Sequence, residues 1–293
     1  MLGPILAVTL AVPDLAAVER AYGDTLGYQV VDRGEISASV SELWDSSAVT
    51  GRPFLVMQPA SGADVHFRFV QSPSVPGYSA LKTLGWNANE LLVEDVDAMP
   101  ELLKESGFEI VAMPRNLSTT DDIKAMQAYG PAGEMIYFTT IKNPAFGLGQ
   151  AESFVDRVFI VINGGRTMQS HLDFYGGVLG LELADPQPVR MSALNKIYGY
   201  DSEEMHPLST ANIGGPFMIE LDQYPDIAIE RPILPNDIPP GISIVSFQVD
   251  SLDSVPVDFR SGVSSPEGFP YGGGRAGVIV GPNGEWLELV ERP

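Results

Sequence analysis

The chain has 293 residues, of which 44% are hydrophobic and 19% charged, and it carries a formal net charge of -21 with no cysteine and three histidines. The length favours two domains, each able to bury an ordinary core. The acidity argues against a nucleic-acid partner, which needs clustered Lys and Arg, and the cysteine count excludes disulfides, thiolate nucleophiles and iron–sulfur ligation.

The first predicted element is an apolar strand over residues 5–12, followed by a helix over 14–26 with Asp14 as its N-cap and Gly27 as its stop. No Lys or Arg precedes this strand and no segment reaches the length of a membrane span. We therefore expect a cytoplasmic protein with no membrane partner. The next predicted elements of the first half are strands 28–31, 54–58, 65–71 and 87–93, a helix over 95–106, and strands 108–112, 125–129 and 134–141.

The second half repeats this order of elements. Its predicted elements are strand 157–162, helix 167–179, strands 181–184, 216–222 and 242–249, a short helix near 252–260, and strands 277–280 and 285–290. The whole chain then contains four βαβββ units, an order typical of an α+β fold. Segments 33–52 and 185–213 are long, polar and irregular, and we expect them to lie over cavity mouths.

A linker is predicted near residues 142–152, where Asn-Pro and Gly-Leu-Gly interrupt any periodicity. The predicted domains are therefore residues 1–145 and 153–293.

Short motifs recur in the two halves. The helix motif reads Ala21-Tyr-Gly-Asp-Thr-Leu-Gly-Tyr28 in the first half and Phe174-Tyr-Gly-Gly-Val-Leu-Gly-Leu181 in the second. Each half closes on a similar hairpin, Gly130-Pro-Ala-Gly-Glu-Met-Ile-Tyr137 and Gly281-Pro-Asn-Gly-Glu-Trp-Leu-Glu288. An internal repeat of this kind indicates a duplicated domain.

With these motifs, nearly the whole chain resembles the vicinal oxygen chelate superfamily, which includes glyoxalase I, type I extradiol dioxygenases, bleomycin-resistance proteins and methylmalonyl-CoA epimerase. The resemblance implies tandem pairs of βαβββ units that form two cup-shaped mixed sheets. It also implies that ligands come from the first and last strand of each unit. It fixes no single activity, because this scaffold carries several unrelated chemistries.

The resemblance assigns eight residues to the ligand positions of the family. They are Ala7, Arg68, Ala88 and Tyr137 in the first half, and Arg157, Glu220, Ile244 and Glu288 in the second. The first set contains no carboxylate or imidazole, so we interpret the first domain as degenerate or structural. The alternative is that Arg68 and Tyr137 bind an anionic oxygen of a substrate.

We place the active or binding cup in the second half. Arg157 would repel a metal ion, and two glutamates alone suit zinc or iron poorly, so we expect no metal and no cofactor. Arg157 is expected to pair with Glu220 or Glu288, which leaves the other glutamate as a general base of raised pKa.

The predicted function is metal-independent proton transfer, as in an isomerase or lyase, on a small and largely apolar organic molecule. One alternative is a binding or sequestration protein of the drug-resistance type, in which the Arg–Glu cluster is only structural. A metal-dependent glyoxalase or extradiol dioxygenase is the less favoured alternative. A homodimer is possible.

Three further residues are candidates near the cups. Trp286 would contribute an aromatic wall for a substrate, although tryptophan is generally buried whatever its role. His66 shares the face of Arg68 and is either an acid or base or a core histidine. His206 is either a lid residue that reaches a substrate or a surface histidine, and His171 is expected to be exposed.

The glycine-rich run 271–277 could bind an anion through its backbone N–H groups. It lacks the strand and helix that flank a nucleotide-binding loop, so a hairpin beside a cavity mouth is favoured.

Overall fold

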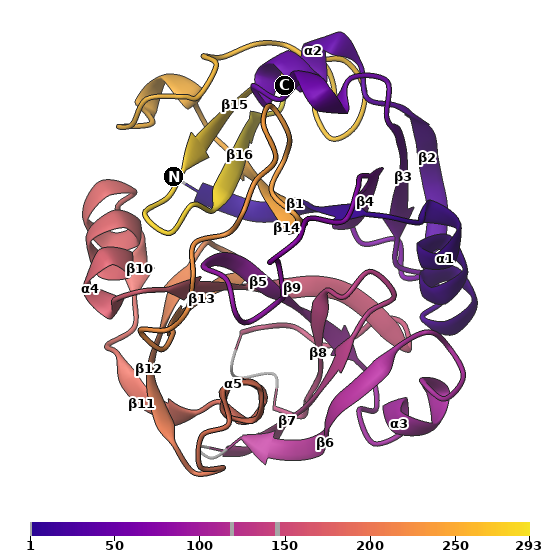
Figure 1. Cartoon of the computed structure of the whole chain (residues 1–293), viewed down its shortest axis with the longest axis vertical. Helices are drawn as coiled ribbons and strands as arrows, with labels where there is room; N and C mark the ends of the chain where they lie inside the picture. The colour runs from indigo at the N-terminus through magenta and orange to yellow at the C-terminus, as the bar shows by residue number, and fades with distance from the viewer. Residues whose placement is uncertain (1, 118–119, 144–146) are drawn as a thin grey trace.

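Figure 1 shows the computed structural model of the chain, which describes residues 2–117, 120–143 and 147–293. Two large mixed sheets fill the upper and lower halves of this view, and short helices lie at their edges. The predicted α+β fold with two mixed sheets is confirmed.

The upper sheet has seven strands in the order β15-β16-β14-β1-β4-β3-β2. Their bounds are β1 (Leu2–Val12), β2 (Gln29–Glu35), β3 (Pro53–Gln58), β4 (His66–Gln71), β14 (Gly241–Val249), β15 (Arg275–Val280) and β16 (Trp286–Glu291).

The lower sheet has nine strands, eight of them in the order β10-β12-β13-β9-β5-β8-β7-β6, while β11 pairs with β12. Their bounds are β5 (Gly85–Val93), β6 (Glu109–Leu117), β7 (Thr120–Tyr129), β8 (Met135–Ile141), β9 (Val155–Gly165), β10 (Glu182–Leu183), β11 (Gln187–Arg190), β12 (Met205–Asn212) and β13 (Met218–Gln223).

The helices are short. They are α1 (Leu15–Arg20) with its continuation η1 (Ala21–Thr25), α2 (Ala38–Leu43), η2 (Ser47–Val49), α3 (Met99–Leu102), α4 (Met168–His171) with its continuation η4 (Leu172–Val178), α5 (Ser192–Tyr198) and η5 (Leu252–Ser254). The Asp14 carboxylate accepts a hydrogen bond from the Ala17 N–H at 3.0 Å, which confirms it as the N-cap of α1.

Two helices are much shorter than predicted. The helix predicted over 95–106 is reduced to α3, and the one near 252–260 to the single turn η5. Pro256 follows that turn closely, and proline disfavours helical backbone in the residue before it.

The two sheets do not follow the two halves of the chain. β1 pairs with β14, and β5 pairs with β9, so the first and fourth units form one sheet and the second and third units form the other. The expectation that each half forms its own cup is therefore wrong. The division into domains 1–145 and 153–293 remains a prediction that rests on the sequence repeat. Its boundary does not separate the two sheets, because each sheet takes strands from both halves.

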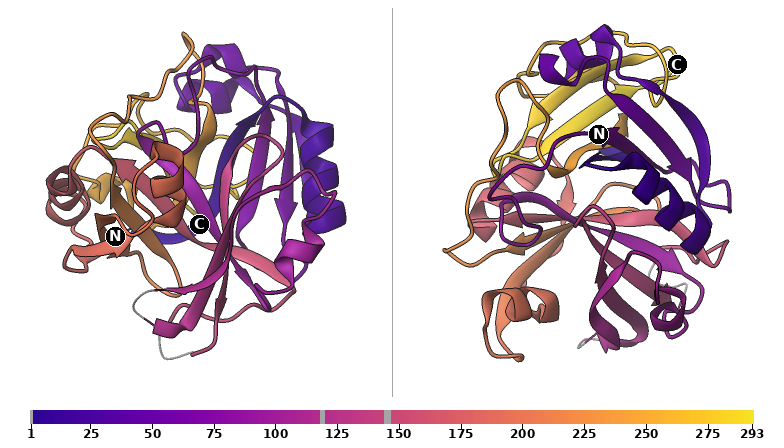
Figure 2. Two further views of the ribbon diagram at one scale, coloured as in Figure 1. Left: turned by 60° about the horizontal axis from the view of Figure 1, so that its bottom comes forward. Right: turned by 45° about the vertical axis from the view of Figure 1, so that its right-hand side comes forward.

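The sheets lie back to back (Figure 2), and their convex faces share one hydrophobic core with the helices. Phe247 of β14 packs against Trp86 of β5, whose indole N–H donates to the Trp286 carbonyl at 2.8 Å. Each concave face has its own smaller cluster. We call the concave side of the seven-stranded sheet the Arg68 cup, and that of the nine-stranded sheet the Glu220 cup.

Each cup is covered by one of the predicted excursions. Segment 33–52 contains α2 at the top of Figure 1, and its Trp44 packs into the Arg68 cup. Segment 185–213 contains α5 at the bottom, and its Lys196 donates to the Val111 carbonyl of β6 at 2.9 Å, which ties α5 to the opposite wall of the Glu220 cup. The sequence patterns did not reveal these helices. No helix within the described ranges is long and apolar enough to cross a membrane.

Candidate functional site

The centre of each sheet brings together the first and last strands of two units. In the Arg68 cup, Thr9 lies opposite Arg68, and Ser246 lies opposite Glu288. In the Glu220 cup, the same register sets Glu90 opposite Tyr137 and Ile162 opposite Glu220. The two cups are therefore built on one plan, with four equivalent central positions each.

This register corrects four of the assignments made from sequence. Thr9 and Ser246 stand at the centre of the Arg68 cup instead of Ala7 and Ile244, each two residues away on its strand. In the Glu220 cup, the central residues are Glu90 instead of Ala88, and Ile162 instead of Arg157. Because residues two apart share a face of a strand, the hydrophobic pattern alone does not distinguish Ala7, Ile244 and Ala88 from the residues at the centre. Arg157 lies five residues before Ile162, and the pairing of β9 with β5 is irregular in this stretch.

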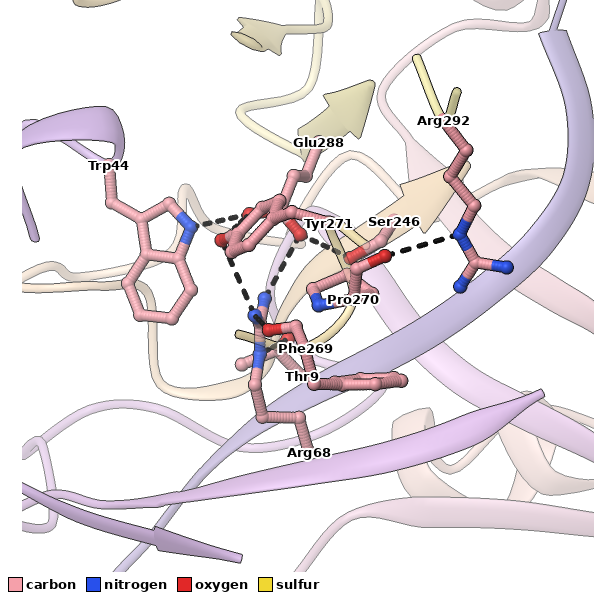
Figure 3. A network of polar contacts seen from close by, with 9 residues as sticks. All are labelled: Thr9, Trp44, Arg68, Ser246, Phe269, Pro270, Tyr271, Glu288 and Arg292. Carbon is pink, nitrogen blue, oxygen red and sulfur yellow. Dashed lines mark hydrogen bonds and ion pairs between the residues drawn. The ribbon is translucent and has the colours of Figure 1, made fainter. Parts of the chain in front are cut away.

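The Arg68 cup holds a buried ion pair, shown in Figure 3. The Arg68 guanidinium donates to Glu288 Oε2 at 3.0 Å and to Thr9 Oγ1 at 2.9 Å. The Glu288 carboxylate also accepts from the Trp44 indole at 2.7 Å, the Tyr271 phenol at 2.9 Å and the Ser246 hydroxyl at 2.5 Å. Glu288 is thus paired with one cation and three neutral donors.

This network fills the Arg68 cup. Arg68 is 1% exposed, and Glu288, Trp44 and Tyr271 are 0% exposed. The Trp44 ring lies under the guanidinium, with the Arg68 Cζ atom 4.6 Å from the ring centroid. A buried charge pair whose remaining donors and acceptors are satisfied is a stable arrangement that has no unmet need for a ligand. The Arg68 cup is therefore occupied by its own side chains.

Two further predicted site residues also belong to this cup. Trp286 is buried, with Arg260 stacked on its ring at 4.1 Å. His66 is buried against the Phe269 ring, and burial lowers its pKa. The glycine-rich run 271–277 contributes Tyr271 to the network, and Arg68 donates to the Phe269 carbonyl at 3.4 Å.

The Glu220 cup, in contrast, encloses a cavity of about 570 Å³. Its wall is mostly apolar and comes from strands of both the second and the third unit. Among the lining residues are Ile123, Ile141, Phe159, Leu208 and Met218. Glu90, Tyr137 and Glu220 line the same cavity.

Two carboxyl groups, Glu90 and Glu220, lie on the floor of this cavity, and the buried Asp222 lies two residues beyond Glu220 on the same face of β13. Burial raises the pKa of Glu90 to about 7, although the Thr139 hydroxyl donates to it at 2.5 Å. Burial also raises the pKa of Asp222 to about 8. The pKa of Glu220 is raised by burial and then by the charge of Asp222, to which its carboxyl is hydrogen-bonded. The cluster therefore holds protons at neutral pH.

The remaining predicted residues lie outside this floor. Arg157 forms an ion pair with Asp156 at 3.0 Å, so the expected pair with Glu220 or Glu288 is not formed. This neighbour on the same strand is close enough to satisfy the guanidinium. His206 lies on β12 and its Nε2 contacts Asn195 Oδ1 at 2.7 Å. His171 is fully buried beside the Asp222 carbonyl, so the prediction of an exposed histidine is wrong.

Sequence reasoning missed several residues of the two cups. Glu90 is a single acidic residue inside a strand that is buried over its whole length. A lone glutamate in an apolar strand indicates a functional or paired carboxyl group, so the sequence pattern could have identified it. Asp222 follows Glu220 by two residues, so the two side chains share a face. Trp44 and Tyr271 lie in irregular segments, and no local pattern connects them to Glu288.

The repeated motifs have a structural role. The Tyr22 phenol donates to the Glu134 carboxylate at 2.8 Å, and the equivalent Tyr175 donates to Glu285 at 3.0 Å. Each pair joins the helix of one unit to the hairpin of the next. The repeat thus preserves contacts between units, and it does not mark the cavity.

The side chains at the centre of the cups suit a transition metal poorly. A guanidinium and two hydroxyls accompany the one carboxylate of the Arg68 cup, and the Glu220 cup offers two carboxylates, a phenol and an isoleucine. Zinc and iron prefer imidazole or thiolate ligands. Among the residues that the structure describes, no group of three or more His, Cys, Asp or Glu side chains is arranged to hold a metal ion.

Solved structures with the same arrangement of units are known. A variant of glyoxalase I from Zea mays superimposes with a TM-score of 0.66 at 12% identity, over 98% of this chain and 93% of that one. The unmodified maize enzyme gives 0.62 at 14% identity, over 98% and 92%. A protein from Bacillus subtilis subsp. subtilis str. 168, described as a candidate dioxygenase, gives 0.62 at 11% identity, over 100% and 86%.

No protein family profile matches the sequence, and no curated protein matches it either. At these identities the structural likeness establishes the fold, and a fold by itself does not establish an activity. The four βαβββ units, the two cups with equivalent centres and the match over nearly the whole chain together show that the protein has the vicinal oxygen chelate fold.

Proposed function

We propose that the protein binds a small, largely apolar organic molecule in the Glu220 cup and transfers a proton to or from it without a metal ion. The observation that carries this proposal is the cavity of about 570 Å³, whose apolar wall surrounds carboxyl groups that titrate near neutral pH. An acid–base group is most effective when its pKa lies near the working pH.

The carboxyl cluster supplies the acid and the base. Glu220 lines the cavity, and Asp222 shares a proton with it from behind. A proton taken from a bound molecule by the ionised cluster therefore stays within a hydrogen-bonded pair. The Tyr137 phenol lines the cavity and can donate to a substrate oxygen on which negative charge develops.

This proposal shifts the site away from part of the set expected from sequence. Glu288, Trp286, Arg68 and His66 face the Arg68 cup, which is filled. Arg157 is held by Asp156 and is not part of the proposed machinery. The choice between the cups rests on accessibility, because Glu220 lines a cavity whereas Glu288 is 0% exposed within its network.

The proposal is tested by proton exchange in D₂O. Ligands are first found by saturation-transfer NMR with a library of small organic molecules, and the same ligands are then followed for deuterium incorporation at carbon. We expect Met218→Trp, which fills the cavity, to abolish binding, and Glu220→Gln to abolish exchange on those ligands that this variant still binds. Exchange that persists in Glu220→Gln would remove this residue from the mechanism.

A non-catalytic binding protein is the second candidate. It is favoured by the apolar character of the cavity rim, where Met113 is 61% exposed and Leu117 is 42% exposed on β6. Such side chains suit a ligand that is held by contact alone. In that case the library yields ligands that Met218→Trp no longer binds, and none of them exchanges a carbon-bound proton with the wild-type protein.

Metal independence follows from the donor set and is tested separately. We expect elemental analysis of the purified protein to find no stoichiometric zinc, iron, manganese or nickel. One tightly bound transition metal per chain would contradict this, and would redirect attention to a metal-dependent glyoxalase or dioxygenase chemistry at Glu220 or Glu288.

A further inference from the structure

The two cups differ in charge at their centres, although they share one plan. The central positions of the Arg68 cup hold one carboxylate, Glu288, which the Arg68 guanidinium neutralises. Those of the Glu220 cup hold Glu90, Tyr137, Ile162 and Glu220, and no arginine. Glu90 and Glu220 line a cavity there.

No cation among the described residues forms an ion pair with these carboxyl groups. In residues 2–117, 120–143 and 147–293, no Lys, Arg or His forms an ion pair with Glu90, Glu220 or Asp222. Arg190 lines the cavity, but it pairs with Glu203 at 3.0 Å. Arg115 lies on the exposed edge strand β6.

Asp222 gives a second, independent indication. It is 3% exposed, and its Oδ1 atom has no hydrogen-bond partner. It lies two residues from Glu220 on β13, so it points to the same concave face. A buried carboxylate oxygen with no donor is costly. Asp222 is hydrogen-bonded to Glu220, which lines the cavity, so a cationic donor that reaches Glu220 from the cavity compensates both carboxyl groups.

We propose that the ligand of the Glu220 cup carries a cationic nitrogen, an organic ammonium on an apolar body, which the carboxyl groups of Glu90 and Glu220 bind, with Asp222 as the buried partner of Glu220. This inference rests on the proposed function, because it names the class of molecule for the same cavity. The ammonium would supply the positive charge that Arg68 supplies in the other cup. The apolar wall would hold the rest of the molecule.

The affinity of such a ligand depends on pH. A cation favours the ionised form of each carboxyl group, so binding must release the protons that the cluster holds. With Glu90 titrating at about 7 and Asp222 at about 8, the affinity rises with pH through this range until the ammonium itself loses its proton. The other titratable or charged groups that face the cluster or its cavity are Tyr137, Tyr224, Asp185, Arg115 and Arg190.

The test compares probes that differ only in the charged group. The first probes are 4-phenylbutylamine, 4-phenylbutan-1-ol and 4-phenylbutanoate. Two further sets consist of the amine, the alcohol and the carboxylate that carry a cyclohexylmethyl group or a naphthylmethyl group. Isothermal titration calorimetry is run at neutral pH in two buffers of different ionisation enthalpy, which reports the protons released. We expect at least one amine to bind about 10-fold or more tightly than its alcohol, with release of protons and no binding of the carboxylate.

Two variants and a control locate the effect. We expect Glu220→Gln and Asp222→Asn to reduce the amine to the affinity of the alcohol. The exposed Glu101→Gln on α3 should leave the preference unchanged. Thermal unfolding confirms that each variant is folded.

The outcomes separate this inference from the proposed function. Amines that bind no better than their alcohols, or that do not bind at all, overturn the inference, and so does stoichiometric binding of Ca²⁺ or Zn²⁺ that competes with the amine. Proton transfer is judged by deuterium exchange instead. An amine preference without exchange on any ligand supports the inference and contradicts the enzyme. Exchange on a neutral ligand without an amine preference supports the enzyme and overturns the inference.

Discussion

At the scale of single residues, the charge at the centre distinguishes the two cups. Arg68 fills the centre of its cup and neutralises Glu288, whereas the Glu220 cup has Tyr137 and no arginine at its centre, and Glu220 lines a cavity. A guanidinium spans the distance between strands and satisfies several acceptors at once. A phenol carries no charge, so the neighbouring carboxyl groups retain protons instead.

The protonated cluster makes stability depend on pH. The folded-state pKa of Asp222 is raised to about 8, so its contribution is fully present below its unfolded pKa and is lost as the pH rises through 8. We expect the melting temperature to fall between pH 6.5 and 8, a window chosen above the ordinary histidine pKa of 6.5. Asp222→Asn should flatten this slope, as measured by calorimetric scans, and Glu101→Gln should not. An unchanged slope in Asp222→Asn would show that this carboxyl is already ionised in the folded protein.

The ion pair of the Arg68 cup should behave as one unit. Removing one partner leaves a buried charge, so Arg68→Met or Glu288→Gln is expected to cost about 3–5 kcal/mol of unfolding free energy. The double variant should cost less than the sum, because neither charge is left alone. Urea unfolding of the wild type, the two single variants and the double variant gives the four unfolding free energies of this double-mutant cycle.

The same variants also separate the two cups. Since the Glu220 cup does not use Arg68 or Glu288, we expect ligand binding by folded Glu288→Gln to equal that of the wild type. Loss of ligand binding in folded Glu288→Gln would mean that the ligand binds in the Arg68 cup.

At the scale of elements, the repeated motifs hold neighbouring units together through hairpin glutamates. A Cβ atom on Gly130 would lie 2.0 Å from Glu134 Oε1, and one on Gly281 would lie 2.2 Å from Glu285 Oε1. The glycines of the repeat are therefore required by the close approach of a carboxylate, which the Tyr22 or Tyr175 phenol then fixes.

Gly130→Ala tests this packing. The new methyl group displaces the Glu134 carboxylate from Tyr22 and leaves buried polar atoms unpaired, so we expect a loss of about 1–3 kcal/mol in urea unfolding. Gly177→Ala is the matched control, because its Cβ would meet no atom within 4 Å. That substitution lies in the helical segment η4 and should be neutral or slightly stabilising. Equal losses in both variants would contradict a specific role for the hairpin.

At the scale of the whole molecule, each sheet combines units from both halves of the chain. The covering segments lie at opposite ends of the molecule in Figure 1. Segment 33–52, which contains α2, packs Trp44 into one cup, and α5 lies over the cavity of the other. The two sheets share one core between them. Neither half of the chain can therefore complete a cup of this molecule alone.

Expression of the two halves as separate polypeptides tests this interdependence. Residues 1–145 and 153–293, produced together, should form a 1:1 complex that elutes like the intact chain, because β1 needs β14 and β5 needs β9. Affinity capture through a tag on one half, followed by size-exclusion chromatography, gives the stoichiometry. Two stable monomers that do not associate would contradict this prediction.

The sequence by itself determined the number and order of the units. Apolar strand patterns, the Asp14 cap and the paired motifs at Tyr22 and Tyr175 are local signals, and most predicted strands are found within a few residues of their expected bounds. The motifs also led to the correct superfamily fold. Local signals suffice there because each element is set by its own periodicity and caps.

Only the tertiary structure decided which units share a sheet and which cup remains open. The four leading strands β1, β5, β9 and β14 are all largely buried and apolar, so their patterns do not say which of them pair. The meeting of Arg68, Trp44, Tyr271 and Glu288 joins segments that are distant in the chain. Such a site depends on strand register and on long-range packing, and neither is encoded in the neighbourhood of any one residue.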